Sequence, residues 1–321
     1  MKKKVILLCA LVIAIGGCFG GWWLLTREEA EAAAGDTLWQ LEDITAVTVT
    51  DDEGAVISLE KTADGWIFVG DSAFPLDQSC PEAMVTALAA PAIDRILTRD
   101  IDLAGWGLDS PWATVTVTGA GGSHAVAFGD KNPVTGQYYA AVAGREGLVY
   151  MLAGDLGTPF TYSLTAMAAL PDPFGTLDST SIYDIQVEST AGTVHLWKES
   201  GTGWVVESAA QGMEKTLADS AIAEEIPSDA GYLFYNELVS WHADDELALF
   251  GLEEPDMTVQ FKGWSIDSPD MAMTVRFRLS RMPEGDNWYM WEEGSDCICT
   301  VYNYQVNRIS ANAVDYLPAA Q

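Results

Sequence analysis

The sequence predicts an α+β protein: two tandem copies of a β-rich module with antiparallel sheets and packed helices, preceded by one transmembrane helix. Three observations carry this prediction: a long uncharged segment near the N-terminus, three pairs of similar segments in the same order, and strand-like alternation inside each copy. The predicted boundaries are a cytoplasmic tip and anchor at 1–27, a stalk at 28–40, and β-rich repeats at 41–172 and 173–321.

A membrane anchor is predicted from the run Val5–Leu25, which has 21 residues and no charge. As a helix this run is about 32 Å long, which matches a bilayer core of about 30 Å. Three lysines precede the run, and Glu28 and Glu29 follow it. This arrangement predicts a cytoplasmic N-terminus and an extracytoplasmic remainder, tied to the cell membrane by a single pass.

Two other interpretations of the same segment stay open. The residues Ile15–Cys18 resemble a lipoprotein signal, in which Cys18 is acylated and anchors the chain. A cleaved secretory signal would instead end at a small-x-small site such as Ala30-Glu31-Ala32. All three interpretations place the body of the chain outside the cytoplasm.

The body of the chain is strongly acidic. Residues 28–321 contain 12 of the 16 Lys and Arg residues and all 47 Asp and Glu residues. A surface of this charge repels phosphate backbones, so the composition argues against nucleic acid as a partner.

An internal repeat is visible as three matched pairs of segments. The order of the segments is kept, and their offset changes only from 138 to 144 residues. Divergence of an ancestral copy through insertions produces this pattern. The pairs are Ile44–Val49 with Ile182–Val187, Gly65–Val69 with Gly203–Val206, and Gly107–Pro111 with Gly251–Pro255.

Each copy is predicted to open with three alternating strands, continue through a helical stretch into four more strands, and close with a helix. The turn Pro171–Gly175, with two prolines and a glycine, is the predicted junction. The predicted helices are Pro81–Ala90, Pro159–Ala169, Leu217–Glu225, Tyr232–Val239 and Gln305–Leu317.

Two motifs in the first copy carry a family resemblance. They are the turn Trp106–Pro111 and the segment Gly129–Pro133, which precede Tyr138-Tyr139 and Val149–Leu152. In these residues the chain resembles a bacterial family named domain of unknown function 4340. The second copy keeps the turn at Phe250–Pro255, but Arg281–Asp286 stands where the second motif is expected.

The resemblance implies an extracytoplasmic protein with one N-terminal membrane helix and an accessory role beside ABC-type transporter components or another envelope complex. The expected protein is therefore not an enzyme, and its expected partners are the membrane and an envelope protein. The family supplies no catalytic residue, cofactor or metal ligand, so none is transferred.

The sequence contains no motif of covalent or nucleotide chemistry: no Gly-x-Ser-x-Gly elbow, no phosphate-binding loop and no EF-hand. Its three histidines, His124, His195 and His242, lack the spacing of zinc ligands and are predicted to be structural. An unrecognised carboxylate pair remains the one enzymatic interpretation. The cysteines outside the anchor, Cys80, Cys297 and Cys299, are interpreted as small buried side chains, and their disulfide state stays open.

The most conspicuous polar cluster is Asp130, Lys131 and Asn132, a candidate loop for a ligand or partner. Its competing interpretation is a plain connection between strands, which turn chemistry favours. The repeated turns are predicted to be architectural, because two copies must keep the same turn. Their residues are Gly107, Leu108, Asp109 and Pro111 in the first copy and Gly251, Leu252, Glu253 and Pro255 in the second.

A second hypothesis for function is a ligand- or glycan-binding protein that uses an aromatic face. Aromatic residues are concentrated in the last strands, where packing in the core is the favoured interpretation. They are Trp288, Tyr289, Trp291, Tyr302 and Tyr304.

Overall fold

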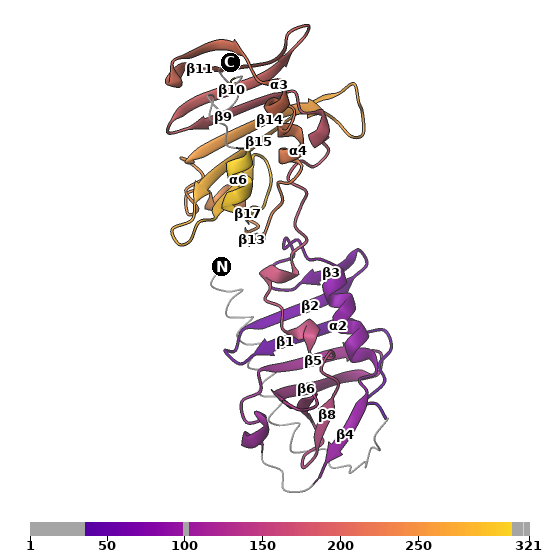
Figure 1. Cartoon of the computed structure of the whole chain (residues 1–321). Coiled ribbons are helices and arrows are strands. Elements are labelled where there is room, and N and C mark those ends of the chain that lie inside the picture. The colour runs from indigo at the N-terminus through magenta and orange to yellow at the C-terminus, as the bar shows by residue number, and fades with distance from the viewer. Residues whose placement is uncertain (1–35, 99–102, 310–316, 318–321) are drawn as a thin grey trace. The chain divides into compact units, whose positions relative to one another are not determined.

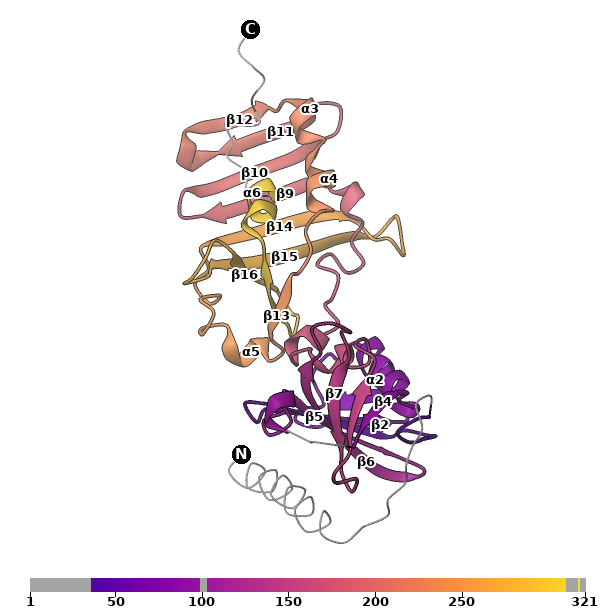
Figure 2. The same ribbon diagram turned by 60° about the horizontal axis from the view of Figure 1, so that its bottom comes forward.

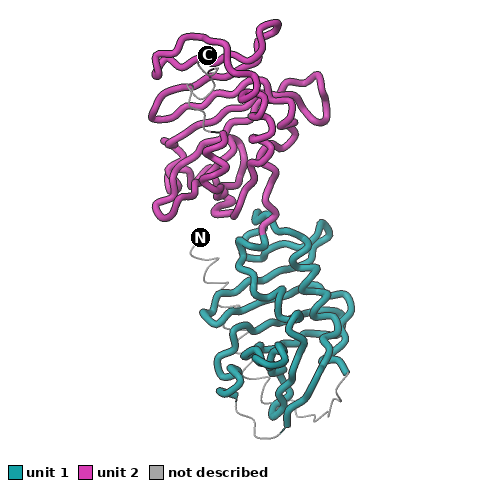
Figure 3. The backbone as a smooth tube through the Cα atoms, in the orientation of Figure 1, with its two compact units in different colours: residues 1–167 teal, residues 168–321 magenta. Residues whose placement is uncertain are grey.

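A computed structural model describes residues 36–98, 103–309 and 317. The chain is β-rich, with two antiparallel sheets and few helices, as the sequence predicts (Figure 1). It divides into two compact units, Met1–Met167 and Ala168–Gln321 (Figure 3). The predicted anchor and Cys18 lie outside the described residues. Within the described residues, no helix combines the length and the apolar character that a membrane crossing needs.

The first unit contains an eight-stranded sheet in the order β3-β2-β1-β5-β6-β7-β8-β4, in which every neighbouring pair is antiparallel. Its strands are β1 (Ala46–Asp51), β2 (Val56–Thr62), β3 (Gly65–Phe68), β4 (Ile93–Leu97), β5 (Ala113–Gly119), β6 (Gly122–Lys131), β7 (Tyr138–Val142) and β8 (Val149–Leu152). In the described part of this unit, the helix α2 (Ser79–Ala89) packs against β1 through its buried side.

Alternation builds the core of this sheet. In β1 and β5, Val47, Val115 and Val117 are fully buried, because they point to the same face. The residues between them, such as Thr48 and Thr116, lie on the opposite, half-buried face. The period-two pattern of the sequence therefore identifies the face that packs.

A side chain protects the outer edge of the first sheet. Gln78, just before α2, accepts a hydrogen bond from the Trp66 amide (2.7 Å) and donates one to the Trp66 carbonyl (3.0 Å). These are the two backbone groups with which a further strand would pair. Gln78 thereby satisfies an edge that is otherwise a template for strand addition.

The second unit contains a nine-stranded sheet in the order β12-β11-β10-β9-β14-β15-β16-β17-β13, seen side by side from β12 to β15 in Figure 2. The helix α6 (Asn303–Ile309) lies against one face in Figures 1 and 2. The strands are β9 (Asp184–Ser189), β10 (Gly192–Glu199), β11 (Gly203–Ser208), β12 (Met213–Leu217), β13 (Glu237–Ser240), β14 (Met257–Trp264), β15 (Ala272–Arg281), β16 (Trp288–Glu292) and β17 (Ile298–Val301).

Both sheets have the same strand order once β12 is set aside. The order from β3 to β4 in the first unit corresponds, strand for strand, to the order from β11 to β13 in the second. β12 covers the edge of β11, and the Ala218 amide donates to the Trp204 carbonyl (3.0 Å). An added strand thus occupies the edge that Gln78 closes in the first unit.

Three predicted helices are wrong in type or length. Pro159–Ala169 contains two short 3-10 turns, Thr158–Phe160 and Thr165–Met167, instead of an α-helix. Tyr232–Val239 overlaps the strand β13, and Leu217–Glu225 contains only the single turn α3 (Ser220–Ala223).

The strands β4 and β12 are missing from the prediction, because their burial does not alternate as the sequence pattern of a half-buried strand does. The burial of β13 alternates, but this strand has only 4 residues and overlaps a predicted helix. β4 and β13 also carry register shifts against β8 and β17. Of the predicted helices, Pro81–Ala90 is confirmed as α2. The described part of the last one begins two residues early, at Asn303.

The segment that enters the first unit is held by three side chains. Trp39 stacks on His124 (ring centroids 4.9 Å apart) and donates to the Leu88 carbonyl (2.7 Å). Arg145 donates to the Leu38 carbonyl (2.6 Å). Burial, and then the positive charge of Arg145, lower the pKa of His124 below its ordinary value of 6.5.

We expect the first unit to lose stability as the pH falls below about 6.5, because the unfolded chain takes up a proton at this histidine before the folded chain does. His124→Phe keeps a flat ring against Trp39 and removes the titration. Thermal melts between about pH 7 and about pH 5 should show a smaller loss of Tm in this variant than in the unchanged chain. Equal losses in both proteins would contradict the assignment.

Candidate functional site

The turn of the first family motif is fixed by a left-handed glycine. A short 3-10 helix, Ala104–Trp106, ends at Gly107, whose φ of +67° suits glycine. The Leu108 amide then donates to the Leu103 carbonyl (2.8 Å). This geometry turns Leu108 into the core, where it is 9% exposed, while Asp109 faces solvent.

The second family motif lies directly against this turn. A Cβ atom on Gly129 would lie 2.2 Å from the Trp106 carbonyl oxygen, and one on Gly107 would lie 2.7 Å from the Asp130 carboxyl group. Only glycine leaves room on both sides. The ring of Trp106 also stacks on Tyr139 of β7 (5.5 Å, 20°). The two motifs therefore form one joint between a turn and a strand, which we call the turn–strand joint.

The candidate loop Asp130, Lys131 and Asn132 belongs to this joint. Asp130 and Lys131 lie at the end of β6, so that the predicted loop is partly strand. The Asn132 side chain is hydrogen-bonded within the chain. Its Oδ1 atom accepts from the Val134 and Thr135 amides, and its Nδ2 atom donates to the Tyr139 hydroxyl (2.7 Å).

The two charged members of the loop are exposed. The Lys131 ammonium group lies 5.2 Å from the ring centroid of Tyr138. The structure therefore brings the three residues together, but leaves only Asp130 and Lys131 facing solvent.

The second unit builds the same joint from different residues. Gly251 has a φ of +71°, and Leu252 is fully buried. Ser280 stands at the strand position that corresponds to Gly129 and donates its hydroxyl to the Gly251 carbonyl (2.7 Å). A Cβ on Gly251 would lie 3.4 Å from that hydroxyl, so this joint is looser. Glu253 is exposed, like its counterpart Asp109.

Ring contacts correspond as well. Phe250 packs edge-on against Tyr289 (4.9 Å), where Trp106 stacks on Tyr139 in the first unit. Arg281 lies over Trp288 (4.3 Å), as Lys131 lies over Tyr138. Each cation pairs across the strands with the residue whose ring it covers. In the second unit, a serine and an arginine thus make the contacts at these positions.

The histidines and cysteines do not assemble into a metal site within the described ranges, where no cluster of three such ligands or carboxylates occurs. His195 lies between Asp184 (3.3 Å) and Glu207 (3.5 Å). Cys80, Cys297 and Cys299 are free thiols. Burial raises the pKa of Cys299 to about 12, which keeps its thiol protonated.

One carboxylate pair interacts across the second unit. Burial, and then the charge of Asp172, raise the pKa of Glu292 above its ordinary value. Burial also raises the pKa of the nearby Tyr235 hydroxyl. Neither carboxylate lines the surface hollow described below.

The predicted aromatic face divides into buried and exposed parts. Trp288 and Trp291 are buried, and Tyr289 is half-buried against Phe250. Tyr302 and Tyr304 are stacked (5.6 Å, 18°) beside other rings at the surface. We call this surface the aromatic patch; its residues are Tyr232, Phe234, Tyr302, Tyr304 and Arg308.

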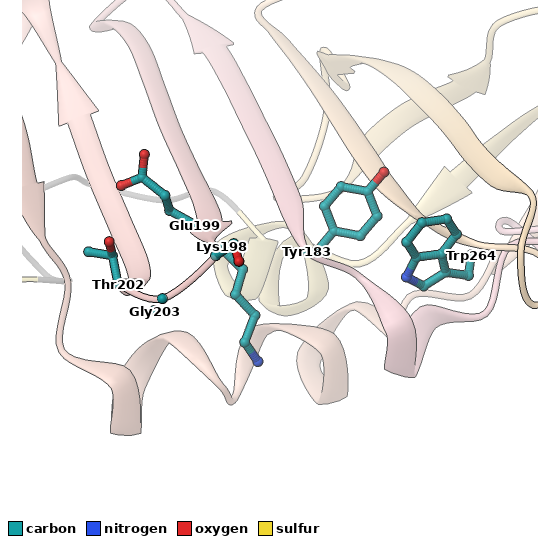
Figure 4. Close-up of a pocket in the computed structure, with 8 residues that line it drawn as sticks. Tyr183, Lys198, Glu199, Thr202, Gly203 and Trp264 are labelled. Atoms are coloured by element: carbon teal, nitrogen blue, oxygen red, sulfur yellow. The ribbon is translucent and has the colours of Figure 1, made fainter.

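A second surface feature is marked by no motif in the sequence. An open hollow of about 630 Å³ lies at one end of the second sheet, beside Tyr183 and Trp264 (Figure 4). The two rings are 5.4 Å apart and tilted by 40°. They are 81 positions apart in the chain and belong to no motif. They become neighbours because β9 pairs with β14. Lys262 and Asp184 are the last pair of that register, close to Trp264 and Tyr183.

The comparison with protein families identifies the chain. Residues 66–230, about half of it, match the family model described as Domain of unknown function (DUF4340). The protein therefore belongs to this family, as the motifs predict. The matched range includes both motifs of the first turn–strand joint and ends before Gly251. No curated protein and no solved structure matches the chain.

We expect Gly129→Ala to destabilise the first unit by about 1–3 kcal/mol, because the added methyl group has no space beside the Trp106 carbonyl. Gly121→Ala is the matched control, since its methyl group would meet only the end of the Leu41 side chain, at 3.3 Å. Urea unfolding compares the two variants. Equal midpoints would show that the joint is not closely packed.

Proposed function

We propose that this protein is a membrane-tethered, extracytoplasmic interaction module, an accessory component of an ABC-type transport or envelope complex, and not an enzyme. Val5–Leu25 supports the tether, with acylation of Cys18 as the other route to the same membrane. The acidic composition of the body supports a well-solvated surface.

The two units are proposed to be tandem copies of one ancestral module. Their identical strand order supports this proposal, because a shared order of eight strands follows naturally from duplication. The two turn–strand joints support it further, since corresponding rings and cations pack in the same way.

The aromatic patch is the observation that favours a protein partner most. Tyr232, Phe234 and Tyr304 are each about half exposed, although large rings normally avoid water. Tyrosine, phenylalanine and arginine are the residue types that concentrate at interfaces, where they anchor the partner. Arg308 lies over the Tyr232 ring (5.2 Å) and pairs with Asp229 (3.1 Å).

A buried glutamine holds the patch in place. Gln305 is 1% exposed and donates to the carbonyls of Tyr232 (2.9 Å) and Phe234 (3.2 Å). Its own carbonyl accepts from the Tyr302 amide (3.0 Å). One side chain thus fixes both segments that carry the rings, and a pre-formed surface loses little entropy on binding. Asp130 and Lys131 are a second candidate contact, exposed on the other unit.

Purification of the full chain from native membranes in mild detergent tests this proposal. We expect a transporter permease or ATPase to be recovered with the unchanged protein. Replacing both Phe234 and Tyr304 with alanine should weaken this association by at least about 30-fold, the effect of losing one strong interface anchor.

Leu249→Ala is the control, because Leu249 is 76% exposed and lies outside the patch. Quantitative mass spectrometry of the recovered proteins, with a thermal melt of each variant, gives the readout. The proposal fails if no transporter component is recovered, or if the patch variant recovers as much of it as the control does.

A further inference from the structure

The hollow of the second unit is an open depression of the surface, lined by residues from β10, β11 and β14 and from the segments beside these strands and β9. Tyr183 immediately precedes β9, and Trp264 is the last residue of β14. The hairpin Ser200–Gly203 between β10 and β11 forms the opposite wall, with Lys198 and Glu199 at its base (Figure 4).

The backbone at both aromatic residues is held by hydrogen bonds. The Trp264 amide donates to the Ser181 hydroxyl (2.7 Å), and the Trp264 carbonyl accepts from the Asp178 amide (2.8 Å). The Tyr183 amide donates to the Lys262 carbonyl (2.9 Å). Trp264 is nevertheless 40% exposed, a costly position for an indole. The backbone that carries both rings is therefore fixed, and the rings contact each other at 5.4 Å.

The charges at the hollow are already neutralised. The Lys198 ammonium group contacts the Glu224 carboxylate (2.7 Å), and the Glu199 carboxylate contacts Lys215 (2.7 Å). An anionic ligand would find no free cation there and would meet a chain of net charge −31. A cationic ligand would have to displace an existing ion pair.

The lining groups that remain free to recognise a ligand are neutral and polar. The hydroxyl groups of Tyr183, Ser200 and Thr202 line the hollow beside the rings. Apolar C–H faces pack on aromatic rings, and hydroxyl groups exchange hydrogen bonds with these side chains. Sugar rings carry both features and no charge. An open hollow also suits an extended chain better than an enclosed metabolite, whose surface would be mostly buried in its site.

We propose that this hollow binds a neutral carbohydrate chain, with Trp264 and Tyr183 as the stacking platform. The site is independent of the aromatic patch and of the accessory role proposed above. It also differs from the predicted glycan face in the last strands, whose tryptophans are buried.

Saturation-transfer NMR on the full chain in detergent tests this assignment. The probes are cellotetraose, maltotetraose and the tetramer of N-acetylglucosamine, with tetragalacturonate as the anionic comparison. We expect at least one neutral tetramer to bind with a Kd on the order of 1 mM. Trp264→Ala should weaken this binding roughly 3- to 10-fold, and Trp264→Phe should restore part of it.

Two further variants separate binding from folding. Thr202→Arg places a bulky side chain in the hollow from an exposed hairpin position and should abolish binding without changing the Tm. Tyr304→Ala removes an exposed ring outside the hollow and should leave binding unchanged. The assignment is overturned if no neutral tetramer binds, if tetragalacturonate binds equally well, or if neither Trp264→Ala nor Thr202→Arg weakens binding.

Discussion

The fold of both units depends on the contact between a glycine turn and the second strand after it, β6 in the first unit and β15 in the second. In the first unit the approach is so tight that neither Gly107 nor Gly129 has room for a side chain. The turn delivers Leu108 to the core, and in the second unit an equivalent turn delivers Leu252. The turn leads into β5 in the first unit and into β14 in the second, the strands that pair with β1 and β9.

This constraint explains why the family motifs are poor guides to function. Several of their residues take part in packing: Asn132 donates to Tyr139 of β7, and Lys131 lies over a tyrosine ring although it stays exposed. The second unit satisfies the same contacts with Ser280 and Arg281. The aromatic patch and the hollow, for which we propose recognition, lie outside these motifs.

The sequence predicts the β-rich fold and the family well, because alternation and repeated turns are local signals. It does not predict β4 or β13, which are short, irregular and defined by pairing with distant strands. The turn glycines are recognised as architectural, whereas their contact with the strand of Gly129 depends on tertiary approach. The pairing of Tyr183 with Trp264 cannot be predicted for the same reason, since only the strand register makes them neighbours.

The central claim is that each unit is stabilised by its own turn–strand joint, including the ring contact of that joint. Double-mutant cycles measure it directly: Trp106→Ala with Tyr139→Ala in the first unit, and Phe250→Ala with Tyr289→Ala in the second. The account predicts a favourable coupling of about 0.5–1.5 kcal/mol in each cycle, from unfolding free energies. Additive effects in either unit, with a coupling near zero, would contradict it.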